Sequence, residues 1–371
     1  MALERLFITC GGTGGHFYPG LAAAKELQNK GGKVLLLLSG VNAQKQSAIA
    51  EEQGIKAVAL PWMPHPLKRP FKFISGLLGG YRQSRKLIKE FAPQAMLGMG
   101  SFASTPAILA AKFLKIPVCL HDGNARVGRA NRVFSRFAEF LATAYECVNA
   151  KAVAAPLSVI GMPLRRELVE KRTLSKSDAI NELNKCFNCN LDEKFDTILI
   201  FGGSQGAAAI NENFATALKI SEKSGFQVLH LCGKGKSDAP KAIYKDAKFP
   251  YLLLESSEKM ELFLAAADIA VCRSGGSSLA ELALFGIPSI LIPYPDAAEG
   301  HQTDNAQVFE RADAAVLVHN IELDIQKAES LMESWFNDKE LWQKRKNNMA
   351  ALARPQATED LLALIEKSIT V

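Results

Sequence analysis

Short, wholly apolar stretches alternate with longer amphipathic ones along the entire chain. Continuous apolar runs of a few residues are typical of parallel strands that are buried on both faces, and the stretches between them suit covering helices. The pattern predicts strands at 6–10, 33–39, 57–61, 95–98, 118–121, 140–143, 158–160, 197–201, 227–232, 251–254, 269–272, 289–292 and 314–318. Because strands and helices alternate throughout, we expect an α/β protein built on parallel sheets.

Glycine-rich loops follow the first strand of each half of the chain, at 11–15 and at 202–206. A strand that enters such a loop and continues as a helix is the opening unit of a Rossmann-like domain. A length of 371 residues also suits two domains of ordinary size. The layout therefore predicts two doubly wound domains in tandem, with the boundary in the charged stretch that follows Arg165.

Composition and charge narrow the class of protein. Hydrophobic residues make up 48% of the chain and charged residues 22%, which supports large cores and excludes wholesale disorder. A formal charge of +6 is too small for a nucleic-acid binder of this length, but it suits an acidic ligand or an anionic membrane surface. No signal peptide or membrane-spanning run is present in the sequence, so we expect a protein of the cytoplasm.

Cysteine usage agrees with a reducing compartment. Seven cysteines scattered over a long chain predict no disulfide framework. Cys186 and Cys189 form a lone C-x-x-C with no second pair and no nearby histidine, so two surface or helix cysteines are the favoured interpretation over a zinc site.

The first glycine loop is the strongest candidate for ligand binding. Glycines let the backbone approach a ligand closely, and the helix that we predict from Pro19 to Gln28 would present its N–H groups to a phosphate or carbohydrate oxygen. His16 lies at the end of this loop. Phe17 replaces the third glycine of the dinucleotide fingerprint, and the Lys-Ser/Thr pair of a Walker loop is missing, which excludes a dehydrogenase or a P-loop enzyme. A tight turn without a ligand and a core or capping histidine remain the alternatives.

Polar residues follow several other predicted strands. Ligands of open α/β sheets collect beyond the carboxyl ends of the strands, where 98–106 and His121-Asp-Gly-Asn124 fall. In the second half, Ser278 and Glu281 are three residues apart on one helix face, where a carboxylate can accept both hydroxyls of a ribose. The alternatives are a turn with local side-chain bonds at His121 and Asp122, and a favourable charge near a helix N-terminus at Glu281.

The segment from Trp62 to Leu87 interleaves apolar and basic residues. Aromatic rings among lipid head groups and cations beside anionic phosphates are what an interfacial segment needs. The segment is thus a candidate for contact with an anionic membrane surface, and a core-packed helix with a solvated basic face is the alternative.

Taken together, the loops resemble the MurG family of N-acetylglucosaminyltransferases. The motifs that carry the resemblance span the chain in order: Gly11-Gly-Thr-Gly-Gly-His-Phe-Tyr-Pro-Gly20, Gly98-Met-Gly100, His121-x-x-Asn124, Gly161-x-Pro-x-Arg165, Gly202-Gly-Ser-Gln-Gly-Ala207, Cys272-Arg-Ser-Gly275 and His301-Gln-x-x-Asn-Ala306. The resemblance implies a GT-B fold, two Rossmann-like domains that face a deep cleft. We expect an N-terminal, membrane-facing acceptor domain over 1–163, a UDP-sugar-binding domain over 164–345, and closing helices over 346–371 that pack back on the first domain.

The same resemblance implies the reaction. It is an inverting transfer of N-acetylglucosamine from UDP-N-acetylglucosamine to the C4 hydroxyl of the muramoyl sugar of lipid I (undecaprenyl-diphospho-N-acetylmuramoyl-pentapeptide), which gives lipid II for peptidoglycan. The protein would act peripherally on the cytoplasmic face of the bacterial inner membrane, beside other wall-synthesis proteins. UDP-N-acetylglucosamine is then a co-substrate, and no cofactor or metal is expected, in line with the absence of an Asp-x-Asp motif.

The resemblance also assigns site residues. Ser204 matches the diphosphate contact, Glu281 the ribose contact and Gln302 the sugar contact. The residues expected to bind substrate are Thr13, Gly14, Gly15, Asn124, Arg165, Ser204, Gln205, Gly206, Ser257, Gly276, Ser277, Ser278, Leu279, Ala280, Glu281, His301 and Gln302. His16 is the expected catalytic base or its nearest polar helper, with Asp122 and His121 as further candidates.

The chain departs from the family pattern in three places. Asp122 stands where the family has glutamate, Ser257 where a hydrophobic residue flanks the uracil, and Gly276 and Ser277 where bulkier residues are common. Two rival functions share the architecture. A nucleotide-sugar 2-epimerase would need additional carboxylates around the anomeric carbon and no lipid acceptor, and a non-catalytic binding protein would not turn over a UDP-sugar.

Overall fold

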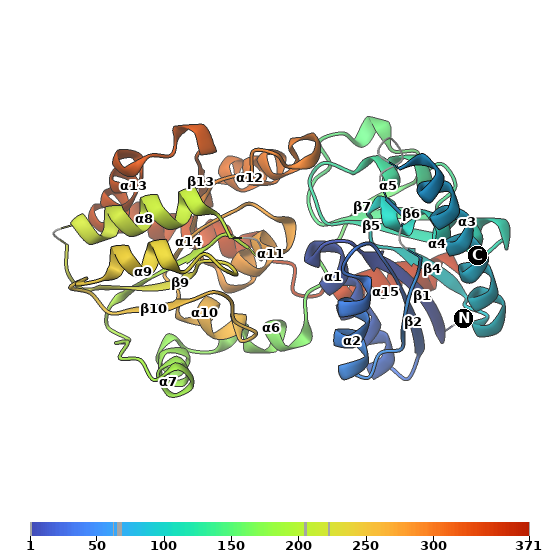
Figure 1. Ribbon diagram of the computed structural model, residues 1–371, viewed down its shortest axis with the longest axis horizontal. Helices are drawn as coiled ribbons and strands as arrows, with labels where there is room; N and C mark the ends of the chain where they lie inside the picture. Colours follow the sequence, from blue (N-terminus) through green and yellow to red (C-terminus); the bar gives the residue numbers. More distant parts are fainter. Residues whose placement is uncertain (1, 62, 65–68, 204–205, 222, 371) are drawn as a thin grey trace. The chain divides into compact units, whose positions relative to one another are not determined.

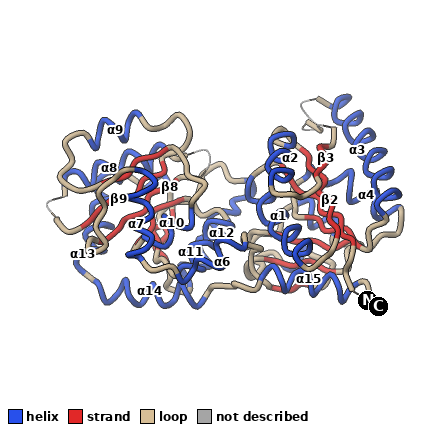
Figure 2. Tube along the Cα trace, turned by 90° about the horizontal axis from the view of Figure 1, so that it is seen from below, coloured by secondary structure: helices blue, strands red, loops and turns tan. Residues whose placement is uncertain are grey.

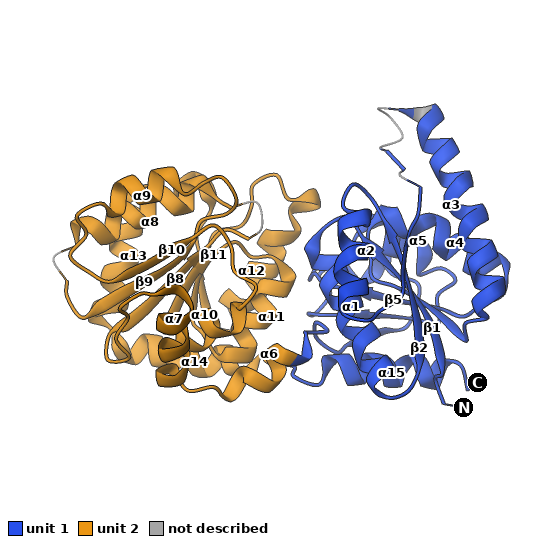
Figure 3. Cartoon of the chain, turned by 60° about the horizontal axis from the view of Figure 1, so that its bottom comes forward, with its two compact units in different colours: residues 1–166, 354–371 blue, residues 167–353 orange. Residues whose placement is uncertain are grey.

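The computed structural model describes residues 2–61, 63–64, 69–203, 206–221 and 223–370 (Figure 1). The chain forms two compact units, coloured separately in Figure 3. Unit 1 comprises Met1–Arg166 and Arg354–Val371, and unit 2 comprises Glu167–Ala353. The first division falls three residues after the predicted boundary at 163. The second falls at 353 rather than 345, because α14 (Lys339–Ala351) packs against α11 (Gly276–Phe285) of unit 2.

Unit 1 is built on a seven-stranded parallel sheet in the order β3-β2-β1-β4-β5-β6-β7. The strands are β1 (Arg5–Gly11), β2 (Lys33–Ser39), β3 (Ala57–Ala59), β4 (Ala95–Gly98), β5 (Val118–Asp122), β6 (Phe140–Thr143) and β7 (Leu157–Val159). Each of the seven predicted strands of this half forms, within two residues of its predicted ends. Central strands buried on both faces produce the continuous apolar runs from which they were predicted.

Helices cover both faces of this sheet (Figure 2). Side chains alternate along β1, so that Leu6 and Ile8 enter the core on one face and Phe7 the core on the other. The first core includes residues of α1 (Gly14–Asn29), α2 (Ala43–Glu52) and α15 (Ala357–Ser368), and the second includes residues of α3 (Pro70–Phe91), α4 (Thr105–Phe113) and α5 (Arg129–Phe134). The fold of unit 1 therefore includes a helix from the far end of the chain.

Unit 2 repeats the architecture with six parallel strands in the order β10-β9-β8-β11-β12-β13. The strands are β8 (Asp196–Phe201), β9 (Phe226–Leu231), β10 (Tyr251–Leu254), β11 (Ile269–Cys272), β12 (Ser289–Leu291) and β13 (Ala315–Leu317). The helices besides α11 and α14 are α6 (Arg166–Glu170), α7 (Lys176–Phe187), α8 (Ala208–Ile220), α9 (Asp238–Tyr244), α10 (Met260–Ala266), α12 (His301–Arg311) and α13 (Ile325–Asn337). The predicted doubly wound, two-domain α/β fold is confirmed.

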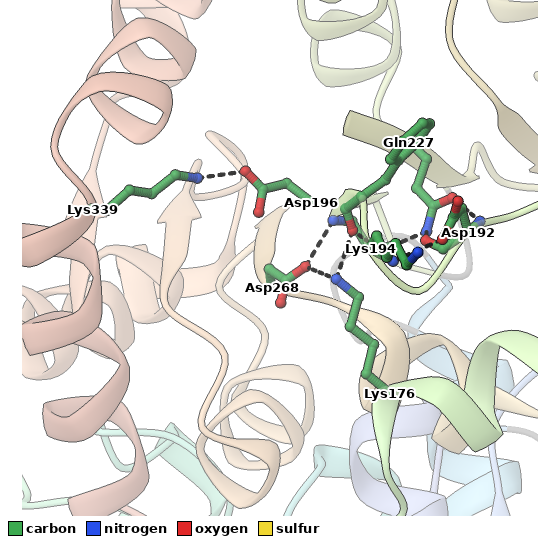
Figure 4. Close-up of polar contacts among 9 residues, drawn as sticks. Lys176, Asp192, Lys194, Asp196, Gln227, Asp268 and Lys339 are labelled. Atoms are coloured by element: carbon green, nitrogen blue, oxygen red, sulfur yellow. Dashed lines mark hydrogen bonds and ion pairs between the residues drawn. The ribbon is translucent and has the colours of Figure 1, made fainter. Parts of the chain in front are cut away.

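A polar network ties the entry of unit 2 to its sheet (Figure 4). The Asp268 carboxylate, just before β11, accepts hydrogen bonds from the Lys176 side chain of α7 and from the Thr197 backbone N–H of β8 at 2.8 Å. The Gln227 side chain exchanges hydrogen bonds of 2.8 and 2.9 Å with the backbone of Asp192. These contacts satisfy buried polar groups where the chain enters the second sheet.

Candidate functional site

The first glycine loop makes a sharp turn at the end of β1. Gly11 and Gly12 have φ values of +128° and +83°, and a Cβ on Gly11 would lie 2.4 Å from the Ser39 carbonyl oxygen. Only glycine fits there, because any larger residue would displace the backbone of β2. The turn therefore depends on the absence of a side chain at Gly11.

Helix α1 begins at Gly14, so the prediction that it starts at Pro19 is wrong. Pro19 lies within the helix and forgoes one hydrogen bond, to the carbonyl of Gly15. Burial of Phe17 in the core of unit 1 outweighs that loss and forms the helix ahead of the proline. Gly14, Gly15 and His16 thus make up the first turn of α1. The His16 N–H donates to the carbonyl of the N-cap residue Thr13 at 3.3 Å, so the N–H groups of Gly14 and Gly15 are the ones without an acceptor in the helix.

His16 lies where two glycine loops meet. Its Nδ1 is 3.1 Å from Thr13 Oγ1, and the side chain is half-buried. A Cβ built on Gly100, in the loop after β4, would lie 3.3 Å from His16 Nε2 and 3.5 Å from Asn131 Nδ2. The bare backbone of Gly100 therefore lets an imidazole and an amide converge from different elements.

His121 and Asp122 are buried at the end of β5. Nε2 of His121 is 3.0 Å from the Gly161 carbonyl oxygen, and burial lowers the pKa of the His121 imidazole, so the neutral ring donates this hydrogen bond. The Asp122 carboxylate accepts hydrogen bonds from the backbone N–H of Gly128 at 2.9 Å and from the Asn131 side chain at 3.0 Å. Further hydrogen bonds come from the backbone and side chain of Asn124. Of the three candidate bases, His16 is the one whose side chain is more than slightly exposed.

Two further predicted residues of unit 1 lie close to this loop. The Arg165 guanidinium lies over the Tyr18 ring at 5.6 Å from its centroid, one turn of α1 from the glycines. A Cβ on Gly123 would lie 2.6 Å from Met162 Cε and 4.0 Å from the Gly15 carbonyl oxygen. The flexible end of the Met162 side chain therefore packs directly on Gly123. Unit 1 gathers residues from the first four motifs around the start of α1.

In unit 2 the corresponding loop follows β8. Ser204 and Gln205 lie outside the described residues. Gly206 has φ +64°, a Cβ there would lie 2.3 Å from the Cys232 carbonyl oxygen, and the Gly206 carbonyl accepts a hydrogen bond from Lys236 at 3.3 Å. Immediately before α8, the backbone of the loop at Gly206 thus packs directly against the backbone at Cys232.

The loop after β11 is tied to the start of α12. Ser274 Oγ donates to the Gln302 carbonyl at 2.8 Å, and the buried Asn305 side chain donates to the Ser274 carbonyl at 3.1 Å. Gln302 Oε1 accepts a hydrogen bond from the Tyr294 backbone at 2.9 Å, and His301 Nδ1 is 2.8 Å from the Ala298 carbonyl. The sixth and seventh sequence motifs, 272–275 and 301–306, therefore form one hydrogen-bonded assembly.

The predicted nucleotide contacts on α11 have different exposures. Gly276 begins the helix, and Ser277, Ser278, Ala280 and Glu281 are half-buried. The Leu279 side chain is fully buried, so it belongs to the core and leaves only its backbone for a ligand. The Ser277 hydroxyl is buried and has no hydrogen-bond partner among the described residues. Buried polar groups in proteins normally form hydrogen bonds, so a buried hydroxyl without a protein partner calls for an explanation. A ligand bound at the start of α11 could accept a hydrogen bond from the Ser277 hydroxyl.

Two polar residues of unit 2 hold its loops in place, a role that the sequence did not predict for them. Arg273 donates hydrogen bonds to the carbonyls of Ile292 and Pro293 at 3.1 and 2.9 Å and to Asn320 Oδ1 at 2.8 Å. Asn305, in the motif 301–306, is fully buried and donates a hydrogen bond to the Ser274 carbonyl. Both side chains shape the loops, although their polar chemistry resembles that of ligand-binding residues. Ser257 makes a local turn by accepting a hydrogen bond from the Lys259 backbone at 3.1 Å.

The basic and aromatic segment is largely helix α3. Trp62 and residues 65–68 lie outside the described residues. Phe71, Ile74 and Leu78 are 86%, 51% and 48% exposed, and Phe73 stacks on Phe102 with ring centroids 5.7 Å apart. The exposed cations of the helix are Lys72, Arg82, Arg85, Lys86 and Lys89. Solvent-exposed apolar and basic side chains thus share one helix, which projects past the sheet of unit 1 (Figure 3).

Among the described residues, no helix is long and apolar enough to cross a membrane. In the same parts of the chain, no three His, Cys, Asp or Glu residues are grouped so that they could hold a metal ion.

Comparison with known proteins places this architecture among the GT-B glycosyltransferases. The model of the glycosyltransferase family 28 N-terminal domain matches residues 6–143, and that of the family 28 C-terminal domain matches 197–361. The chain belongs to glycosyltransferase family 28.

Its relatives within this family share one name. The chain is 33% identical to a protein of Halothermothrix orenii and 34% identical to one of Shewanella sp. (strain ANA-3), in each case over 98% of both chains. Both relatives are named UDP-N-acetylglucosamine--N-acetylmuramyl-(pentapeptide) pyrophosphoryl-undecaprenol N-acetylglucosamine transferase. The expected resemblance to the MurG family is thereby confirmed.

Solved structures agree with the family assignment. The crystal structure of Acinetobacter baumannii MurG matches with a TM-score of 0.79 and 27% identity, over 98% of this chain and 99% of that one. A UDP-GlcNAc 2-epimerase from Neisseria meningitidis matches with a TM-score of 0.71 but only 16% identity, over 98% of this chain and all of that one. The epimerase therefore shares the fold alone.

Replacement of Gly11 by alanine tests the close backbone approach at the first loop. We expect Gly11→Ala to destabilise unit 1 by about 3 kcal/mol or more, because the new Cβ combines an unfavourable φ with a backbone clash. Gly31→Ala is the matched control, since Gly31 also has a positive φ but nothing lies within 4 Å of the added Cβ. The measurement is denaturant unfolding followed by circular dichroism. Equal losses of stability in the two variants would contradict the clash.

Proposed function

We propose that the chain transfers N-acetylglucosamine from UDP-N-acetylglucosamine to the C4 hydroxyl of the muramoyl sugar of lipid I, with inversion at the anomeric carbon, to give lipid II. The observation that carries the proposal is the identity above 30%, over 98% of both chains, with transferases of that name. The loops after β1, β4, β5, β8 and β11 add chemical support, because they offer glycine turns, helix N-termini and polar side chains.

The donor is assigned to residues of unit 2. Glu281 accepts the ribose hydroxyls, and Gln302 contacts the sugar. The N–H groups at the starts of α8 and α11 stabilise the negative charge that develops on the departing UDP. The Ser277 hydroxyl, which lacks a protein partner among the described residues, donates a further hydrogen bond to the nucleotide.

His16 acts as the general base. The Thr13 hydroxyl beside Nδ1 accepts the Nδ1–H hydrogen bond, so Nε2 keeps its lone pair and receives the proton of the acceptor hydroxyl. As that oxygen bonds to the anomeric carbon, the bond from this carbon to the UDP oxygen breaks and UDP leaves. Asp122 and His121 act as positioning residues, because their contacts shape the loop that contains Asn124.

The first test is the transfer reaction itself with metal ions removed. We expect labelled N-acetylglucosamine to pass from its UDP donor to a lipid I analogue in the presence of EDTA, because helix N-termini and side chains supply the charge stabilisation. Chromatographic separation of labelled product from donor gives the measurement. UDP-sugar binding without transfer would overturn the proposed reaction, and loss of transfer that Mg²⁺ restores would overturn its metal independence.

Removal of the base should separate catalysis from donor binding. We expect His16→Ala to lower kcat by about a hundredfold or more, while the donor Kd stays within about twofold, since the imidazole acts on the acceptor proton. His319→Ala removes an exposed histidine of unit 2 and serves as the control. Steady-state kinetics and calorimetric donor binding supply the two numbers. Parallel losses in kcat and donor affinity would refute the role of His16.

We also propose that α3 holds the protein on the cytoplasmic face of the inner membrane. Its exposed Phe71, Ile74 and Leu78 would enter the head-group region while the neighbouring cations meet anionic lipids. A peripheral attachment of this kind would bring the protein to an acceptor whose lipid chain stays in the bilayer.

Charge substitution on α3 tests this attachment. We expect a variant with Phe71→Asp, Ile74→Asp and Leu78→Asp to bind anionic vesicles at least about tenfold more weakly, because it loses apolar contacts and gains repulsion. Ile321→Asp, at a 95% exposed position of unit 2, is the control. Vesicle sedimentation gives the affinities. Unchanged binding of the triple variant would assign membrane contact to another surface.

A further inference from the structure

A groove of about 640 Å³ opens on unit 1 beyond the carboxyl ends of β2 and β3. Its apolar lining comes from Val41, Ala59, Leu60 and Pro61, and its amide groups come from Gln44 of α2 and Gln83 of α3. None of the seven family motifs contributes a lining residue, and Gln83 comes from the segment of interleaved apolar and basic residues. The groove therefore has no role in the reaction as described so far.

The groove shares a wall with the first glycine loop. Ser39, the last residue of β2, pairs with Gly11 of β1, and a Cβ on Gly40 would lie 3.2 Å from Gly12 Cα. The Asn42 side chain donates a hydrogen bond of 2.9 Å to the Gly12 carbonyl. The backbone that lines one end of the groove thus touches the turn that leads to His16.

The other wall of the groove belongs to α3. Gln83 lines it directly, and a Cβ on Gly79 would lie 3.5 Å from Pro61 Cγ, so the helix packs against the same lining. The exposed apolar residues of α3 lie on the turns of this helix before Gly79. The groove therefore borders both the helix proposed to meet the membrane and the loop after β2 that touches the first glycine loop.

The chemistry of the lining residues indicates which part of the acceptor fits the groove. All eight lining residues are uncharged. A diphosphate or a peptide carboxylate would enter such a groove without a cation to balance it, which is costly. An uncharged hydrocarbon chain loses only water on entering and gains contact with the apolar residues.

We propose that this groove binds the prenyl chain of the acceptor, at the end next to its diphosphate. The inference rests on the proposed function, since it assigns one part of that acceptor to a place on unit 1. The prenyl chain runs from the membrane at α3 through the groove, and the diphosphate and sugar that follow it reach the glycine loop. The groove thereby makes the enzyme favour acceptors with a lipid chain over chainless ones.

The experiment fills the groove and varies the acceptor. Gln44→Trp places an indole in the groove from an exposed position of α2. Gln53→Trp makes the same substitution at the exposed C-cap of α2, on the side of the helix opposite Gln44, and is the control. Two acceptors are used in detergent, with identical sugar and peptide but either a long polyprenyl chain or a methyl group on the diphosphate. KM and kcat are measured for each acceptor, together with the donor KM.

We expect Gln44→Trp to raise KM for the polyprenyl acceptor about tenfold, because the indole takes the place of part of the chain. Its kcat, its donor KM and all constants for the methyl acceptor should stay at wild-type values, as should every constant of Gln53→Trp. The wild-type preference for the polyprenyl acceptor should disappear in Gln44→Trp.

Other outcomes are distinguishable. An equal rise in KM for both acceptors, or no rise for either, overturns the assignment of the prenyl chain. A third acceptor, with the long chain but without the peptide, identifies a peptide occupant if the effect of Gln44→Trp vanishes with it. Failure of the wild-type chain to transfer to any of these acceptors would instead overturn the proposed function.

Discussion

The passage of the Gly11 backbone beside the Ser39 carbonyl is the constraint on which the functional part of unit 1 depends. Because β1 and β2 end together there, the chain must turn at once, and it does so through two residues with positive φ. That turn sets where α1 begins and hence where His16 lies relative to Gly100 and Asn131. It also brings Gly12 against the loop after β2, which joins the glycine loop to the groove.

Much of the fold was accessible from sequence because buried parallel strands have an unmistakable composition. Each apolar run from β1 to β13 could be identified from its own residues alone, because both faces of a central strand are covered by other parts of the protein. Helix starts were harder to predict, as α1 shows. The proline suggested a start at Pro19, whereas burial of Phe17 against the sheet, a property of the assembled unit, extends the helix to Gly14.

The sequence predicted which loops form the candidate site, but it predicted less well what each residue in those loops does. Asp122 and His121 stand at the end of a strand, where a catalytic pair is plausible, yet their partners Gly128, Asn131 and Gly161 come from positions that no local pattern connects to them. Arg273 and Asn305 have side chains suited to phosphates and sugars but bind backbone carbonyls of neighbouring loops. Only the assembled tertiary structure separates residues that shape a loop from residues that face a ligand.

The return of α15 to unit 1 has a consequence for biosynthesis. Leu361 and Ile365 fill a core that also contains residues of β1 and α1, so segments that leave the ribosome more than 300 residues apart share one interior. Unit 2, which is continuous in sequence, can complete its core while unit 1 still lacks a helix. During translation unit 2 would then complete its core before unit 1, and the nascent first unit would keep apolar surface exposed until α15 has been synthesised.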